Sequence, residues 1–231
     1  MVRMEEFSFA YLSGDKNLLM KSSETKGQRI LLWCGILSSI WYVIINVLVP
    51  LQYDGYSIAS LTVSELSAIG APTRSLWVPL AIPYVLLFAA FGFGLRQYAK
   101  NDRRTGLMGG IIIVYAFFNI YWPPMHMRGT APTLTDTLHI VWASVTVLMI
   151  ITIMIIGAVV FNGFFRAYTI VSIAAHVLFG ALTSLQAPQI PLNGSTPTIG
   201  LLERINIGVF TIWVVVLAAR CMQTQTSRRP F

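Results

Sequence analysis

The feature that most constrains this chain is a series of apolar runs, each close to the length of a membrane crossing. The hydrocarbon core of a bilayer is crossed by about 20 apolar residues in a helix, and runs of this kind fill most of the 231 residues. The mean hydropathy is +0.68, and only 11% of the residues are charged. These values predict an all-α, polytopic membrane protein and leave no room for a separate soluble domain.

Six transmembrane helices are expected from these runs. Their predicted ranges are 30–51, 76–98, 106–124, 133–161, 167–185 and 200–219. Together they form one six-helix transmembrane domain over residues 29–220, between an N-terminal leader at 1–28 and a tail at 221–231.

The segment between the first two helices, residues 52–75, is too polar to cross a bilayer. Its apolar residues Ile58, Leu61, Leu66 and Ile69 nevertheless recur at near-helical spacing. This pattern predicts a short amphipathic helix that lies in the membrane interface.

Basic residues are distributed very unevenly between the two ends of the predicted helices. Of the 16 lysines and arginines, only Arg74, Arg128 and Arg204 fall on the side that carries the interfacial helix. By the positive-inside rule, both termini are cytoplasmic and the interfacial helix is extracytoplasmic, which predicts a multi-pass protein of the cell membrane. Topology thus accounts for the net charge of +7, and nucleic-acid binding is excluded as an explanation.

Ionisable residues are concentrated in the connection over residues 119–139. It holds two of the three histidines together with an arginine and an aspartate. Because such groups are costly beside a membrane span, their concentration predicts a functional site. The predicted outer face gathers Asp54, Glu65, Arg74, His126, Arg128, Asp136, His139, Glu203 and Arg204.

Three residues of this connection have the chemistry of a metal site. Asp136 and His139 are three apart at a helix start, and His126 lies on the adjoining loop. They could hold a divalent metal such as zinc with one open position, or act without a metal as general acid and base. The structural alternative stays open: Thr133 and Asp136 match a capping box, His139 can donate to a backbone carbonyl, and Arg128 can pair with Asp136.

The predicted fifth helix carries one polar stripe. Ser172, His176, Gly180 and Thr183 recur on one side of it. Such a stripe either packs against a neighbouring helix or lines a cavity. A single histidine on an apolar helix is more often a buried, hydrogen-bonded side chain than a ligand.

Two sequence motifs resemble a known family. The first comprises Tyr53-Asp54-Gly55-Tyr56-Ser57, Ser64-Glu65-Leu66-Ser67-Ala68 and Gly70-Ala71-Pro72-Thr73-Arg74, and the second comprises Pro124 to Gly129 and Thr135 to His139. Over the six-helix body, the chain is similar to mostly bacterial membrane proteins grouped as a domain of unknown function, number nine-nine-eight. This resemblance implies fold and location but no reaction. The scattered Ser, Asp and His residues also look, more loosely, like those of intramembrane metal-dependent amidases such as alkaline ceramidases, which have seven spans and more histidines.

Two classes of function follow from this pattern. The first is an intramembrane hydrolase or transferase that acts on a membrane lipid or other amphiphile, with His126, Asp136 and His139 as its catalytic residues. The predicted substrate-binding residues are Glu65, Arg128, Glu203 and Arg204. The second class is a binding or transport protein without catalysis. The scarcity of polar residues on the cytoplasmic side of His176 favours the enzyme, because a transporter needs a polar path across the membrane.

Overall fold

The structure is a computed structural model that describes residues 3–100 and 102–226, and this described part is all-helical. Its α-helices are α1 (Arg3–Leu48), α2 (Arg74–Ala99), α3 (Arg103–Phe118), α4 (Leu134–Val160), α5 (Phe164–Gln186) and α6 (Ile199–Thr226). Short 3-10 helices are η1 (Pro50–Gln52), η2 (Ser64–Ser67) and η3 (Ala187–Gln189). The predicted all-α class is confirmed.

Five helical segments are long and apolar enough to cross a membrane. They are Lys26–Gln52, Arg74–Ala99, Leu134–Val160, Phe164–Gln189 and Ile199–Gln223. Exposed apolar side chains lie along their outer surfaces, as contact with lipid requires. The protein is therefore a membrane-type helical bundle.

Helix α3 is shorter than the sequence predicts. It has 16 residues and ends at Phe118, whereas the predicted range extended to Pro124. The Asn119 side chain donates from Nδ2 to the Tyr115 carbonyl at 2.8 Å and closes the last turn. The two prolines at 123 and 124 then lack the N–H groups that would continue the helix.

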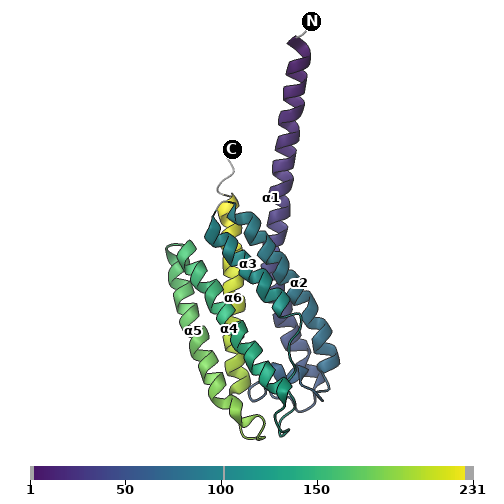
Figure 1. Cartoon of the computed structure of the whole chain (residues 1–231), viewed down its shortest axis with the longest axis vertical. Helices are drawn as coiled ribbons and strands as arrows, with labels where there is room; N and C mark the ends of the chain where they lie inside the picture. Colours follow the sequence, from purple (N-terminus) through teal and green to yellow (C-terminus); the bar gives the residue numbers. More distant parts are fainter. Residues whose placement is uncertain (1–2, 101, 227–231) are drawn as a thin grey trace.

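The helices pack in a ring in chain order, and α1 closes the ring by contacting α6. Figure 1 shows the connections α1–α2, α3–α4 and α5–α6 together at one end of this bundle. We call this end the loop face; it comprises residues 49–73, 119–133 and 187–198. The N-terminal part of α1 extends beyond the opposite end, where α6 also ends.

The predicted leader and tail are largely helical. Helix α1 is continuous from Arg3 and includes most of the leader, and α6 continues to Thr226 within the predicted tail. Residues 1–2 and 227–231 of these two segments lie outside the described residues.

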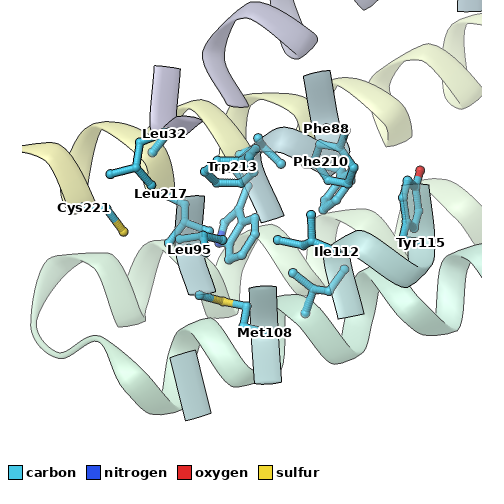
Figure 2. Close-up of a cluster of buried hydrophobic side chains, with 14 of the residues drawn as sticks. Leu32, Phe88, Leu95, Met108, Ile112, Tyr115, Phe210, Trp213, Leu217 and Cys221 are labelled. Atoms are coloured by element: carbon cyan, nitrogen blue, oxygen red, sulfur yellow. The ribbon is translucent and has the colours of Figure 1, made fainter. Parts of the chain in front are cut away.

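Large apolar side chains fill the centre of the ring. Figure 2 shows Phe88 from α2, Ile112 from α3, and Phe210 and Trp213 from α6 packed together. The Trp213 indole also donates to Thr169 Oγ1 on α5 at 2.9 Å, so its only polar atom is satisfied. The interior is a packed core of the kind that stabilises helix contacts in lipid.

Helix α3 is held against α2 by a contact between glycines. A Cβ atom on Gly109 would lie 2.7 Å from the Gly92 carbonyl oxygen, and a Cβ on Gly92 would lie 2.9 Å from the Gly109 oxygen. Only residues without a side chain allow backbones to approach this closely. This contact sets the position of the C-terminal end of α3, where the chain enters the loop face.

The segment expected as an interfacial helix folds differently. Residues 53–73 form a loop whose only regular element is the four-residue helix η2. Leu66 is fully buried and packs with Ile45, Val49 and Trp77 beneath the loop. Gly55 and Gly70 take positive φ values of 79° and 91°, which suit glycine and turn the chain over the end of the bundle.

Candidate functional site

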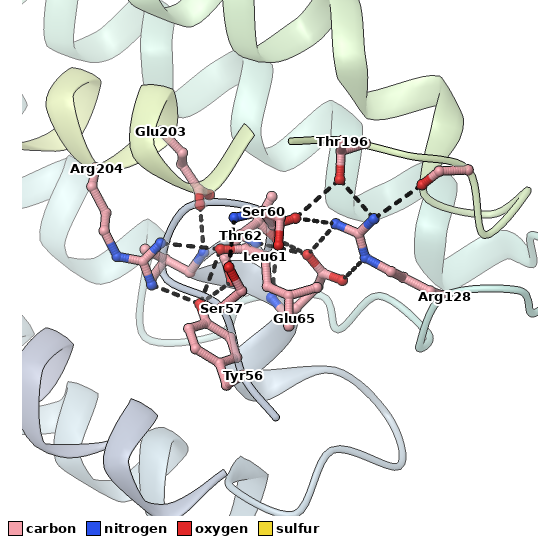
Figure 3. A network of polar contacts seen from close by, with 12 residues as sticks. Tyr56, Ser57, Ser60, Leu61, Thr62, Glu65, Arg128, Thr196, Glu203 and Arg204 are labelled. Carbon is pink, nitrogen blue, oxygen red and sulfur yellow. Dashed lines mark hydrogen bonds and ion pairs between the residues drawn. The ribbon is translucent and has the colours of Figure 1, made fainter. Parts of the chain in front are cut away.

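Two groups of charged residues lie at the loop face and on the adjoining first turns of α4 and α6. The first, which we call the arginine layer, consists of Glu65, Arg128, Glu203 and Arg204 with their partners. The second is the His126–Asp136 pair. Figure 3 shows the arginine layer, in which side chains from three separate connections converge.

Arg128 joins the three connections of the loop face. Its Nε and Nη2 atoms donate to the two carboxylate oxygens of Glu65 at 2.5 and 3.0 Å. Nη2 also donates to the Ser60 carbonyl at 2.8 Å, and Nη1 donates to Thr196 Oγ1 at 2.7 Å and to the Gly194 carbonyl at 3.5 Å. Every nitrogen of the guanidinium is thus occupied within the protein. The alternative pairing of Arg128 with Asp136, considered from the sequence, is wrong.

Arg204 ties α6 to the α1–α2 loop. Its Nη1 donates to the carbonyls of Ile58 and Leu61, both at 3.0 Å, and its Nη2 donates to the Tyr56 hydroxyl at 2.6 Å. The Tyr56 hydroxyl in turn donates a hydrogen bond to the Thr62 carbonyl of this loop at 2.7 Å. Burial raises the pKa of this phenol to about 12, above its ordinary value.

Glu203 and Gly200 complete the attachment of α6. The Glu203 carboxylate accepts a hydrogen bond from the Val63 backbone N–H and another from Ser64 Oγ at 3.4 Å. Gly200 donates from its backbone to the Ala59 carbonyl at 2.9 Å. The α1–α2 loop therefore rests directly on the first turns of α6.

The His126–Asp136 pair brings together the α3–α4 connection and the first turn of α4. Asp136 Oδ1 accepts from the His126 backbone N–H at 2.7 Å, and Oδ2 lies 2.8 Å from His126 Nδ1. Oδ2 also accepts from the N–H of Thr133 at 2.8 Å, and the Thr133 hydroxyl donates to it at 2.9 Å. The capping box predicted for Thr133 and Asp136 is confirmed.

The imidazole of His126 has one nitrogen engaged and one open. Because Asp136 is a carboxylate, the 2.8 Å contact at Nδ1 is a donated hydrogen bond, which places the neutral ring's lone pair on Nε2. Nε2 makes no hydrogen bond within the described residues and is not among their buried unpaired atoms. The side chain is 24% exposed. This arrangement can accept a proton at Nε2.

His139 is turned away from this pair. Its Nδ1 lies 2.7 Å from the Pro123 carbonyl and 3.0 Å from Trp122 Nε1. One nitrogen cannot donate to the carbonyl and accept from the indole at once, and the shorter distance favours donation to Pro123. The structural alternative, a bond to a backbone carbonyl, is therefore the one observed.

The three predicted metal ligands are not arranged as a metal site. Among the described residues, no group of three His, Cys, Asp or Glu side chains is placed to hold a metal ion. The hydrogen bonds explain this result: both Asp136 oxygens are engaged by His126 and Thr133, and His139 faces Pro123. The predicted zinc site is thus not supported.

The polar stripe of α5 packs against α6. His176 is 1% exposed, its Nδ1 lies 3.2 Å from the Asn206 carbonyl, and Asn206 donates from Nδ2 to the His176 carbonyl. A Cβ atom on Gly180 would lie 3.2 Å from Asn206 Nδ2. Of the two alternatives for this stripe, contact with a neighbouring helix is observed.

A cavity of about 220 Å³ opens beside the arginine layer. Its lining residues are Tyr53, Leu61, Glu65, Ala68, Met127, Arg128 and Asn193. Sequence reasoning assigned neither Tyr53 nor Asn193 to the site, because no local pattern shows that residues of different connections meet in space. Neither His126 nor His139 lines the cavity, although His126 precedes two residues that do.

Comparison with known proteins extends only to a family without an assigned activity. No curated protein and no solved structure matched the chain. The family described as protein of unknown function (DUF998) matches residues 36–220, a range that begins within α1 and contains α2 to α5, most of α6 and the whole loop face. The motifs noted in the sequence lie within this range, and the chain belongs to the DUF998 family.

Proposed function

We propose that this protein is a membrane-embedded hydrolase or transferase for an amphiphilic substrate, with His126 as its general base. The observation that carries the proposal is the open Nε2 of His126 on a ring whose Nδ1 is held by Asp136 at 2.8 Å. A base that is oriented by a second group is the arrangement general base catalysis requires.

The reaction that fits this pair is proton transfer during attack by water or an alcohol. Nε2 takes the proton as the oxygen nucleophile bonds to the substrate's electrophilic centre, and Asp136 stabilises the imidazolium that forms. The bond to the leaving group then breaks, and Nε2 returns the proton to that group. His126 ends the cycle neutral, and no other reactant is needed.

An amphiphilic substrate is favoured by the apolar surroundings of the site. Leu134 begins the helix that carries Asp136 and is 72% exposed, and Leu192 on the α5–α6 connection is 73% exposed. Apolar side chains at the ends of membrane helices are suited to contact with the apolar part of a lipid, while the reacting group stays at the loop face.

The other predicted site residues receive supporting roles in this proposal. Glu65, Arg128, Glu203 and Arg204 hold the loops that frame the site, since their carboxylates and terminal guanidinium nitrogens are engaged within the protein. His139 positions the segment before His126 through its contact with Pro123. Transport is less favoured, because packed apolar side chains fill the centre of the ring.

We also propose a topology for the protein in the cell membrane. All six helices cross it, the loop face is extracytoplasmic and both termini are cytoplasmic, in agreement with the asymmetry of basic residues. Reporter fusions near Lys100 should be cytoplasmic and those near Gly129 external. An external reporter at Lys100 would overturn this orientation.

The enzymatic proposal can be tested with the protein reconstituted in liposomes made from a bacterial lipid extract. Mass spectrometry should detect time-dependent conversion of an amphiphile by the parent protein and its loss in His126→Gln. The matched control is His139→Gln, which removes the other histidine at this end of the bundle and should retain measurable conversion. No conversion by the parent, or equal conversion by His126→Gln, would overturn the proposed catalysis.

A further inference from the structure

The cavity beside the arginine layer is formed by three connections of the loop face. Tyr53 and Glu65 come from the α1–α2 loop, Met127 and Arg128 from the α3–α4 connection, and Asn193 from the α5–α6 connection. Its volume of about 220 Å³ equals about seven water molecules at roughly 30 Å³ each. A compact head group fits this space.

Charge in the cavity wall is balanced. Glu65 is 5% exposed and forms a two-point ion pair with Arg128, the only other charged residue in the lining. All of the Arg128 nitrogens are already engaged, as Figure 3 shows for its contacts with Glu65 and Thr196. A phosphate, carboxylate or ammonium group in the cavity would therefore have no free counter-charge and would be costly to desolvate.

Two neutral polar groups in the wall are free to bind a ligand. The Tyr53 hydroxyl and the Asn193 side-chain amide make no hydrogen bond within the described residues. Burial raises the pKa of the Tyr53 phenol, so the hydroxyl keeps its proton and can both donate and accept. The Asn193 amide also offers both functions. Leu61, Ala68 and Met127 supply an apolar surface beside them.

We propose that this cavity binds the uncharged, hydroxyl-bearing head group of an amphiphile, such as a glycerol or a single sugar unit. Hydroxyl groups pair with Tyr53 and Asn193, and the C–H faces of the head group pack on Leu61 and Met127. The inference assigns the substrate class of the proposed enzyme and rests on that function for its catalytic meaning. The binding itself is independent of turnover.

A test compares three probes that share an oleoyl tail and differ in the head group. The probes are 1-monooleoylglycerol, oleoyl lysophosphatidylcholine and oleic acid, each titrated into the protein in phosphatidylcholine nanodiscs while the melting temperature is recorded. We expect saturable stabilisation by monooleoylglycerol and no saturable stabilisation by the two charged probes. Stabilisation of equal size by either charged probe would overturn the proposal.

Substitutions in the cavity wall test whether monooleoylglycerol binds in this cavity. Tyr53→Phe removes only a hydroxyl, and Asn193→Gly removes the amide while tolerating the positive φ of 52° at this position. Each should weaken monooleoylglycerol binding about threefold to tenfold, as expected for one neutral hydrogen bond. Tyr121→Phe, an exposed loop-face tyrosine outside the lining, is the control and should bind as the parent does. Unchanged affinity in both wall variants would place the probe elsewhere and refute the assignment.

The His126→Gln variant separates this inference from the proposed catalysis. It should bind monooleoylglycerol with the affinity of the parent, because His126 does not line the cavity. In the parent protein, binding without conversion would remove the enzymatic proposal and keep the head-group assignment, and conversion without binding in the cavity would do the reverse.

Discussion

The arginine layer and the His126–Asp136 pair lie at the same end of the bundle but use their polar atoms differently. In the arginine layer, all nitrogens of Arg128 and both terminal nitrogens of Arg204 are engaged by partners from other segments. In the pair, Asp136 is fully engaged while His126 keeps Nε2 open. Arg128 and His126 therefore differ in the hydrogen-bonding capacity that each side chain leaves open.

This difference has an energetic counterpart. Removing one member of a buried ion pair leaves the other without a partner and is strongly destabilising. Removing a half-exposed group with one hydrogen bond costs much less. Substitutions ranked by their effect on stability therefore test the comparison directly.

The largest expected effect belongs to Arg128→Ala. It removes the contacts to Glu65, Ser60 and Thr196 and leaves the Glu65 carboxylate buried, which should lower the free energy of unfolding by about 3–5 kcal/mol. Chemical denaturation in detergent measures this loss. The control is Arg166→Ala, an exposed arginine bonded to Ala158 O and Asn162, which should cost less than about 1 kcal/mol. Similar losses in both variants would show that the arginine layer is not a structural clamp.

A second, smaller effect is expected where the α1–α2 loop rests on α6. In Gly200→Ala, the new Cβ would lie 2.1 Å from the Leu61 carbonyl oxygen and 2.5 Å from that of Ile58, so the loop must move. We expect a loss of about 1–3 kcal/mol, typical of overpacking. Gly208→Ala on the same helix meets no atom within 4 Å and should be neutral or stabilising. Equal melting temperatures for Gly200→Ala and Gly208→Ala would show that the loop does not rest on Gly200.

These predictions depend on contacts that the sequence could not supply, although much of the fold could be predicted from it. The helix positions follow from local apolar runs, and the Thr133–Asp136 capping box follows from a spacing of three. The partner of Arg128 is Glu65, 63 positions away, while Asp136 was an equally charged candidate nearer in sequence. Only the three-dimensional course of the connections decides between them.

The candidate site shows the same division between local and distant information. The sequence brought His126 and Asp136 together correctly, because both flank one helix start. It also predicted His139 as a third ligand from helical spacing, but the ring turns to Pro123 and Trp122 on the preceding segment. The interfacial helix was mispredicted for a related reason: the polar backbone of residues 53–73 is satisfied by side chains such as Arg204, which periodicity cannot reveal.

A third prediction concerns Tyr56, whose hydroxyl bridges Arg204 and the loop. Tyr56→Phe should cost about 1 kcal/mol, the usual contribution of a hydrogen bond. Because burial raises the pKa of this phenol to about 12, the folded state holds the proton more tightly than the unfolded state. The contribution is therefore constant below about pH 10 and is lost as the pH rises toward 12. Melting temperature against pH measures it.

The reference for this titration is the parent protein at the same pH values. The stability of the parent should fall more steeply between pH 10 and 12 than that of Tyr56→Phe. Equal slopes in Tyr56→Phe and the parent would indicate that this phenol titrates alike in the folded and unfolded protein.

The smallest effect on stability is expected for His126→Gln, and this variant sharpens the comparison most. Its side chain is 24% exposed and donates one hydrogen bond to Asp136, so the loss should stay near or below about 1 kcal/mol. If Nε2 is the base, conversion of the substrate should nevertheless fall about 10²- to 10⁴-fold.

Diethyl pyrocarbonate, which acylates unprotonated imidazole nitrogens, should label His126 in the folded protein and spare His176, which is 1% exposed. A large loss of stability with His126 unlabelled would mean that its imidazole is as fully engaged as the guanidinium of Arg128. The contrast between an occupied structural layer and an open chemical group would then fail.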